Sequence, residues 1–242
     1  MTVPAATETE RLCVCLAGLF AGARTLVIGA NSPIPAAAAL LAHHRQPDMI
    51  LGIQGSDEHD FFLGGGGEQF DFVAEGRLDA FVIGGAQIDG QANLNLVAAG
   101  DYAHPAVRFP GSFGSAFVYF LVPRVIIFRE EHNRRVLVPK VDFVSAPGTS
   151  PPDVYRPGGP THLLTGKALF EFDRVRERFR LASIHGADSV DEIAAETGFQ
   201  FDCDATVPAT PSPTEVDLER LRGSVRDRLA HIYPEFVAAR FI

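Results

Sequence analysis

The first 85 residues alternate short apolar runs with stretches in which apolar residues recur at helical spacing. A capping box, Thr7-x-x-Glu10, predicts a helix over residues 8–20, and Ser32 followed by Pro33 predicts the start of a second helix. The apolar runs are residues 25–30, 49–53 and 78–85. Because strands that alternate with helices are joined by right-handed crossovers, this pattern predicts an open, mostly parallel α/β sheet with flanking helices.

Paired strand-like segments are typical of the second half of the chain and predict antiparallel hairpins there. We expect one hairpin over residues 125–144, with its charged turn at 130–135, and another over residues 162–185. A second capping pattern, Ser189-x-x-Glu192, predicts a short helix after the second hairpin.

The C-terminal residues form a separate pattern. Prolines in residues 206–213 predict an extended linker, and Ser212-Pro213-x-Glu215 predicts the start of an amphipathic helix. We therefore expect a single α/β domain over residues 1–242, in which residues 206–242 are a linker and a C-terminal helical appendage.

Residues 81–100, FVIGGAQIDGQANLNLVAAG, change abruptly from a buried apolar run to polar side chains. Gly84 and Gly85 at the strand end let the backbone lie against a ligand, since no Cβ intervenes. The polar residues that follow are Gln87, Asp89, Gln91, Asn93 and Asn95. Amide side chains donate and accept hydrogen bonds without carrying charge. The segment predicts the floor of a polar site at a sheet edge.

Gln54 occupies a comparable place, directly after the apolar run of residues 49–53. Ligands of parallel α/β sheets gather at the carboxyl ends of the strands. We therefore expect Gln54, Gly84 and Gly85 to belong to one site.

The turn at residues 110–116, PGSFGSA, places Gly111 and Gly114 on either side of Ser112. It has two interpretations that the residues leave open. One is a simple turn from strand to helix, and the other is a glycine-rich helix start whose N–H groups bind an anion or a thioester oxygen.

Composition restricts the classes of function. The chain is 46% hydrophobic and 21% charged, as expected of a globular protein with its own core. Its net charge of -9 argues against nucleic-acid or anionic-membrane partners, because both bind basic surfaces. An acidic N-terminal segment and the lack of any long apolar run predict a cytoplasmic protein without signal peptide or membrane span.

The metal-binding residue types lack the spacing of a metal site. None of the eight histidines falls in an HxxxH or HExxH pattern, so we expect no metal. Cys13, Cys15 and Cys203 likewise form no CxxC motif. We expect all three to be reduced and buried thiols.

Several motifs occur in a fixed order. GGAQID at residues 84–89 precedes an Asn-x-Asn pair, and the later blocks are GDYAHPAVRFPGS at 100–112, VDFVSAPG at 141–148, LFEFD at 169–173 and ETGFQFD at 196–202. Together they resemble the β subunit of the glutaconate CoA-transferase type in the class I CoA-transferase family. The resemblance implies an α subunit of similar fold as partner, in a heterodimer or heterotetramer. It also implies a shared interface site, an acyl-CoA thioester as substrate and no bound cofactor.

The resemblance also implies where the nucleophile stands. In members that transfer CoA, a glutamate after a Pro-Asp pair and a short strand becomes a glutamyl-CoA thioester. Here Pro47-Asp48 and the strand are followed by Gln54, six residues after the aspartate. A neutral amide is a very poor nucleophile. We expect Gln54 to orient the substrate instead.

The remaining site residues are also implied by the resemblance. The backbone around Gly84, Gly85 and Gly111 would stabilise charge at the thioester oxygen. Gln87, Ser112 and Gly114 complete the expected substrate-binding set.

These expectations favour a family member that hydrolyses a carbon–carbon bond in a cyclic acyl-CoA, or one that decarboxylates an acyl-CoA. Two alternatives stay open. One is a genuine CoA transferase whose nucleophile is Glu58, Asp57 or a carboxylate of the partner. The other is a non-catalytic structural subunit.

Overall fold

The computed structural model describes residues 5–62 and 64–241, and their contacts divide the chain into two compact units. The first unit comprises Met1–Glu68, Leu78–Val82 and Pro211–Ile242. The second comprises Gln69–Arg77 and Ile83–Thr210. The C-terminal segment therefore belongs to the same unit as the N-terminal one, although the two are separated by most of the sequence.

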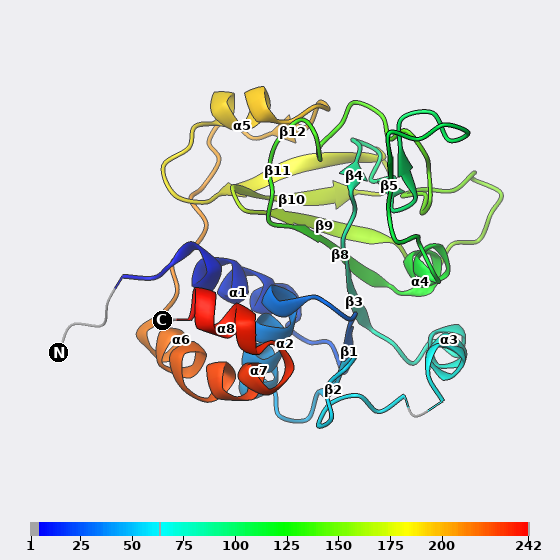
Figure 1. Ribbon diagram of the computed structural model, residues 1–242. Coiled ribbons are helices and arrows are strands. Elements are labelled where there is room, and N and C mark those ends of the chain that lie inside the picture. Colours follow the sequence, from blue (N-terminus) through cyan, green and yellow to red (C-terminus); the bar gives the residue numbers. More distant parts are fainter. Residues whose placement is uncertain (1–4, 63, 242) are drawn as a thin grey trace. The chain divides into compact units, whose positions relative to one another are not determined.

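Parallel strands flanked by helices form the first unit, as the alternating pattern predicts (Figure 1). Its strands are β1 (Thr25–Ile28), β2 (Ile50–Ile53) and β3 (Ala80–Ile83), and β1 pairs in parallel with both of the others. Its helices are α1 (Glu8–Leu19), α2 (Pro33–Arg45), α6 (Glu215–Arg220), α7 (Arg226–Ile232) and α8 (Pro234–Arg240). The predicted capping box starts α1, because the Thr7 side chain and Glu10 bond each other's backbone N–H groups.

The second unit is built on longer strands. These are β8 (Arg124–Arg129), β9 (Pro160–Thr165), β10 (Ala168–Asp173), β11 (Arg178–Ile184) and β12 (Asp202–Cys203). β8 with β9 and β11 with β12 are parallel, whereas β9, β10 and β11 form consecutive antiparallel pairs. The mixed α/β class with antiparallel hairpins in the C-terminal half is thus confirmed.

Short elements complete the second unit. They are β4 (Gln87–Ile88) paired with β5 (Leu94–Asn95), β6 (Ala98–Ala99) paired with β7 (Val107–Arg108), and the helices α4 (Ser115–Leu121) and α5 (Val190–Glu196). The helix α3 (Gly66–Ala74) begins in the first unit and ends in the second.

The hairpin predicted over residues 125–144 is wrong. β8 pairs with β9, and the second predicted strand instead bonds β4, where Ile88 donates to the Val136 carbonyl and accepts from the Val138 N–H. The distances are 2.8 and 2.9 Å. Strand propensity therefore identified an extended segment correctly, but a partner distant in sequence took its backbone hydrogen bonds.

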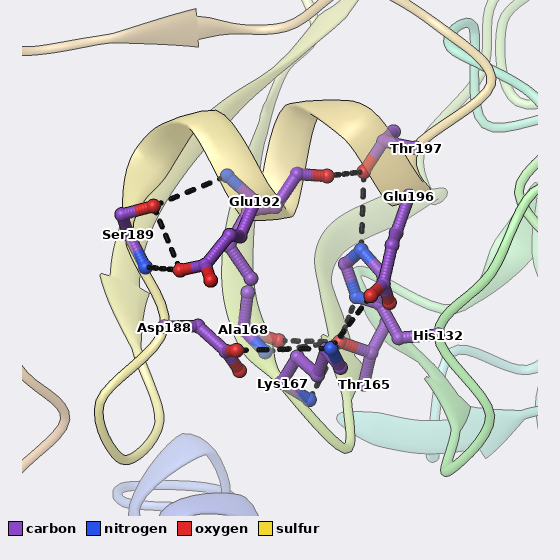
Figure 2. Close-up of polar contacts among 10 residues, drawn as sticks. His132, Thr165, Lys167, Ala168, Asp188, Ser189, Glu192, Glu196 and Thr197 are labelled. Atoms are coloured by element: carbon purple, nitrogen blue, oxygen red, sulfur yellow. Dashed lines mark hydrogen bonds and ion pairs between the residues drawn. The ribbon is translucent and has the colours of Figure 1, made fainter.

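A buried histidine explains why the chain does not return to β8 (Figure 2). His132 lies between two hydroxyl groups, with Nδ1 2.7 Å from Thr165 Oγ1 and Nε2 3.1 Å from Thr197 Oγ1. Thr165 ends β9, and Thr197 follows α5. The segment after β8 is thereby fixed to β9 and α5.

Two further expectations need correction. The last helical segment starts at Thr214 and not at Ser212, because Thr214 forms a capping box with Asp217. It is also not one continuous helix: a π-helical segment, η1 (Leu221–Val225), contains Gly223 with non-helical angles and separates α6 from α7. Proline at residue 234 then begins α8.

The expectation of three buried thiols holds only in part. Cys13 is buried and Cys15 is half-buried, whereas Cys203 is exposed on the short strand β12. Burial raises the pKa of the Cys15 thiol to about 11, so this thiol stays protonated at neutral pH.

Candidate functional site

Gln54 directly follows β2, as the sequence indicates, and its side chain is fixed in the first unit. Its backbone N–H donates to the Ile28 carbonyl at 3.0 Å, which continues the pairing of β2 with β1. Its side-chain oxygen accepts the Ala30 N–H at 3.2 Å. Because the oxygen is engaged with the backbone, the amide NH2 is the donor end of this side chain.

Glu58, the second catalytic candidate, is engaged in an ion pair. Its carboxylate accepts hydrogen bonds from Arg228 of α7, which also lies 3.0 Å from His59 Nε2. The hydrogen bond from Arg228 lowers the pKa of Glu58. Burial lowers the pKa of His59, which favours its neutral form. Asp57, the other fallback nucleophile, is exposed.

The second unit contains a cavity of about 540 Å3 around the predicted glycines. Its lining residues are Gly84, Gly85, Ala86, Gln87, Leu96, Ala99, Val107, Phe109, Pro110, Gly111, Arg129 and Arg135. Gly85 is needed sterically, since a Cβ there would lie 3.1 Å from both the Gln87 carbonyl oxygen and the Ile88 side chain. A largely apolar hollow with a few polar groups at its edge is typical of small-molecule sites.

Gln87 reaches this cavity, but its side chain is mostly used inside the protein. Its oxygen accepts from the Asn95 amide at 2.8 Å and from the Asp142 N–H at 3.0 Å, and its amide donates to the Asp142 carboxylate at 2.9 Å. Gln87 therefore fixes the cavity wall and keeps little hydrogen-bonding capacity for a ligand.

The other polar residues of residues 81–100 hold loops together. Asp89 accepts from the backbone N–H groups of Gln91 and Asn93, and the Asn93 oxygen accepts from Gly148. Asn95 is fully buried and bonds the backbone at Ala98. Asp89, Gln91, Asn93 and Asn95 all lie outside the lining of the cavity around Gly84. The alternating amides are thus mainly a structural network.

The glycine-rich turn contributes unequally. Gly111 lines the cavity, yet its N–H already donates to the Leu96 carbonyl at 3.2 Å. Ser112 and Gly114 are outside the lining and lead into α4. Gly114 is required there by packing, because a Cβ would lie 2.1 Å from the Phe70 ring.

Sequence reasoning missed two cationic residues at the cavity. Arg129 and Arg135 both line it and both bond the Glu131 carboxylate, which Asn133 also bonds. The hydrogen bonds from Asn133 and Arg135 lower the pKa of Glu131 to about 2. A charged turn is usually solvated surface, but Arg129 ends an apolar strand, which is the signal that singled out Gln54.

The structure thus gathers Gly84, Gly85, Gln87 and Gly111 around one cavity of the second unit, and it places Gln54 and Glu58 in the first unit. Over residues 5–62 and 64–241, no cluster of three or more His, Cys, Asp or Glu side chains could hold a metal ion. In the same ranges, no helix has the length and apolar character needed to cross a membrane.

A family model described as coenzyme A transferase matches residues 19–196. The chain therefore belongs to the coenzyme A transferase family. This agrees with the motifs over residues 84–202 and with the α/β fold.

Three curated relatives and two of their solved structures refine the comparison. The β-type (B) component of glutaconate CoA-transferase of Acidaminococcus fermentans is 35% identical over 152 residues, or 60% of this chain and 56% of that protein. The corresponding component of 3-oxoadipate CoA-transferase of Pseudomonas knackmussii is 31% identical over 68% of this chain and 66% of that protein. This chain therefore spans less than two thirds of the length of either relative.

A third relative aligns over nearly the whole chain. The cholesterol ring-cleaving hydrolase IpdB subunit of Rhodococcus jostii is 26% identical over 94% of this chain and 97% of that protein. The crystal structure of R. jostii IpdAB has a TM-score of 0.78 at 26% identity, covering 90% of this chain and 94% of that chain. The A. fermentans glutaconate CoA-transferase structure has a TM-score of 0.79 with the same coverage, and its 23% identity shows the fold alone.

Proposed function

We propose that this chain is the β-type subunit of a heteromeric enzyme that acts on an acyl-CoA thioester without a covalent glutamyl intermediate. The observation that carries the proposal is the neutral side chain of Gln54 at the end of β2, with its oxygen held by the Ala30 N–H. An amide in this position donates a hydrogen bond but does not attack a thioester.

The cavity of the second unit supports binding of the acyl part. Its wall is backbone at Gly84 and Gly85 and apolar at Leu96 and Phe109, which suits a thioester and its carbon chain. Arg129 and Arg135 add positive charge to an otherwise acidic protein. Cationic groups at this edge would attract an anionic acyl-CoA.

The alignment with a ring-cleaving hydrolase subunit favours hydrolysis of a carbon–carbon bond, with decarboxylation as the related chemistry. Both reactions develop charge at the thioester oxygen, which donors fixed in place stabilise. The assembly would be a heterodimer or heterotetramer with an α-type subunit, with the acyl-CoA as substrate and no resident cofactor.

Genuine CoA transfer remains the second candidate, because two of the relatives are transferase subunits. It would need Glu58, Asp57 or a carboxylate of the partner as nucleophile. The pairing of Glu58 with Arg228 argues against Glu58, since an ion-paired carboxylate is a weaker nucleophile.

Gln54→Glu tests the mechanism directly. The complex with its α-type partner would be incubated with glutaryl-CoA or butyryl-CoA, reduced with borohydride and analysed by peptide mass. We expect no adduct in the wild type and a reducible thioester at residue 54 in the variant, together with new CoA transfer to acetate. Gln91→Glu, at an exposed amide outside the cavity, is the matched control and should give no adduct.

An adduct on Glu58 or Asp57 of the wild type would overturn the proposal in favour of transfer. Gln54→Ala adds a second measurement. We expect it to lower turnover of the physiological thioester on the order of 10²-fold, as loss of one donor to a developing charge does. Unchanged turnover would instead support a structural subunit.

A further inference from the structure

The loop that follows Gln54 is folded tightly by its own backbone. Ile53 donates to the His59 carbonyl at 3.1 Å, and Asp60 donates to the Ser56 carbonyl at 2.9 Å. The Asp60 carboxylate accepts the Gly55 N–H at 3.1 Å, and Gly55 adopts φ of +83°, which favours glycine. Any group that holds residues 55–60 therefore also fixes the end of β2.

One side chain from the C-terminal helices holds this loop. The guanidinium of Arg228 bonds both carboxylate oxygens of Glu58, with Nε 3.4 Å from Oε2, and one of its nitrogens lies 3.0 Å from His59 Nε2. Arginine only donates, so His59 Nε2 is the acceptor and the ring is neutral. A bidentate bond to a carboxylate fixes orientation as well as distance.

The helix that carries Arg228 is itself firmly anchored in the first unit. Leu229, the next residue, is fully buried. Ser224 bonds His44 of α2 at 2.8 Å, and Arg222 bonds the buried Glu10 of α1 at 2.6 Å. Arg228 is thus a fixed point against which the end of the loop can be held.

We propose that Arg228 is a positioning residue that holds residues 55–60 and thereby sets the place of Gln54. It lies outside residues 19–196, the part of the chain that the family model matches, so this support comes from the C-terminal segment. The inference rests on the proposed role of Gln54, whereas the physical link between Arg228 and the loop does not.

Hydrogen exchange of the loop amides measures that link without any substrate. In the complex with its partner subunit, we expect Arg228→Ala to speed exchange of the Ile53 and Asp60 amides by about tenfold or more. Arg228→Lys, which keeps the charge but loses the bidentate bond, should have an intermediate effect. Arg226→Ala is the matched control, because Arg226 lies on the same helix and bonds only its neighbour Asp227 among the described residues.

Exchange that is the same in Arg228→Ala and the wild type would overturn the proposal. Glu58→Gln provides a second variant that leaves the helix intact, and it should speed exchange in the same peptide. If Arg228→Ala fails to fold, Arg228→Lys and Glu58→Gln decide the result.

The consequence for chemistry is measured in the Gln54→Glu background, with butyryl-CoA as the probe. We expect Arg228→Ala to slow formation of the adduct at residue 54 by about tenfold, Arg228→Lys to restore part of the rate, and Arg226→Ala to leave it unchanged. An unaltered rate in Arg228→Ala would remove the positioning role. If Gln54→Glu forms no adduct while Arg228 is intact, the proposed function fails, and hydrogen exchange still decides whether Arg228 holds the loop.

Discussion

His132 shows how a single buried residue determines the course of the chain. It is 7% exposed, and both ring nitrogens face hydroxyl groups that also bond backbone carbonyls: Thr197 donates to Ile193 and Thr165 donates to Ala168. Lys167, Glu196 and Asp188 form ion pairs close by (Figure 2). The sequence offered one histidine in a charged turn, and only the fold shows it to be an internal link.

The protonation of His132 gives a prediction for stability. Burial lowers its pKa from 6.5 in the folded protein, so below that pH the unfolded chain binds the proton more readily. Stability is therefore lost as the pH falls below 6.5 toward the lower pKa of the folded protein. We expect the free energy of unfolding to decrease less in His132→Gln than in the wild type between about pH 7 and pH 5.

Denaturant unfolding at several pH values would measure this difference. His44, His59 and His162 also have lowered pKa values and contribute equally to both proteins, so the difference in slope isolates His132. Equal slopes would mean that His132 titrates alike in both states.

At the scale of elements, local signals were reliable and pairing partners were not. The capping boxes at Thr7 and Ser189 lie where the sequence placed them, because each needs only residues three apart. The hairpin over residues 125–144 failed because its strands pair with β9 and β4. Gly114 is an intermediate case: the sequence marked a turn, and the structure shows that packing against α3 requires a glycine.

Gly114→Ala tests that packing. A Cβ would lie 2.1 Å from the ring of Phe70, which also contacts Phe113 and Phe117, so the ring has to move. We expect a loss of about 1–3 kcal/mol in the free energy of unfolding. Gly67→Ala in α3 is the control, because nothing lies within 4 Å of its Cβ position, and it should be neutral or stabilising by up to about 1 kcal/mol.

Unfolding curves of both variants, and of Gly114→Ala combined with Phe70→Ala, would check the cause. The double variant should lose less stability than the two single changes added together. Additive losses would show that the Phe70 ring is not the obstacle.

At the scale of the whole molecule, the C-terminal segment is part of the first unit's core. Figure 1 shows α6, α7 and α8 beside α1 and α2. The buried apolar side chains of this segment are Leu218, Leu221, Val225, Leu229, Val237 and Phe241. Each contributes about 1.5–3 kcal/mol by burial, so together they rival the net stability of a typical domain, about 5–15 kcal/mol.

A chain that ends at residue 210 should therefore lose the cooperative unfolding of the first unit. Calorimetry and hydrogen exchange of α1 and α2 would show this as missing protection. Val216→Ala, on the exposed face of α6, is the control and should change the free energy of unfolding by less than about 0.5 kcal/mol. Native protection of α1 in the shortened chain would make the segment a dispensable appendage.

The sequence alone determined the features that depend on residues close together or on the identity of one side chain. These are the helix starts, the alternation of strands and helices, the ordered family motifs and the uncharged amide at Gln54. Tertiary structure alone decided where long-range bonds form: Arg228 on Glu58, Arg129 and Arg135 at the cavity, and Gln87 on Asp142. The physical reason is that a buried polar group bonds whichever partner the fold brings near, and that partner can stand anywhere in the chain.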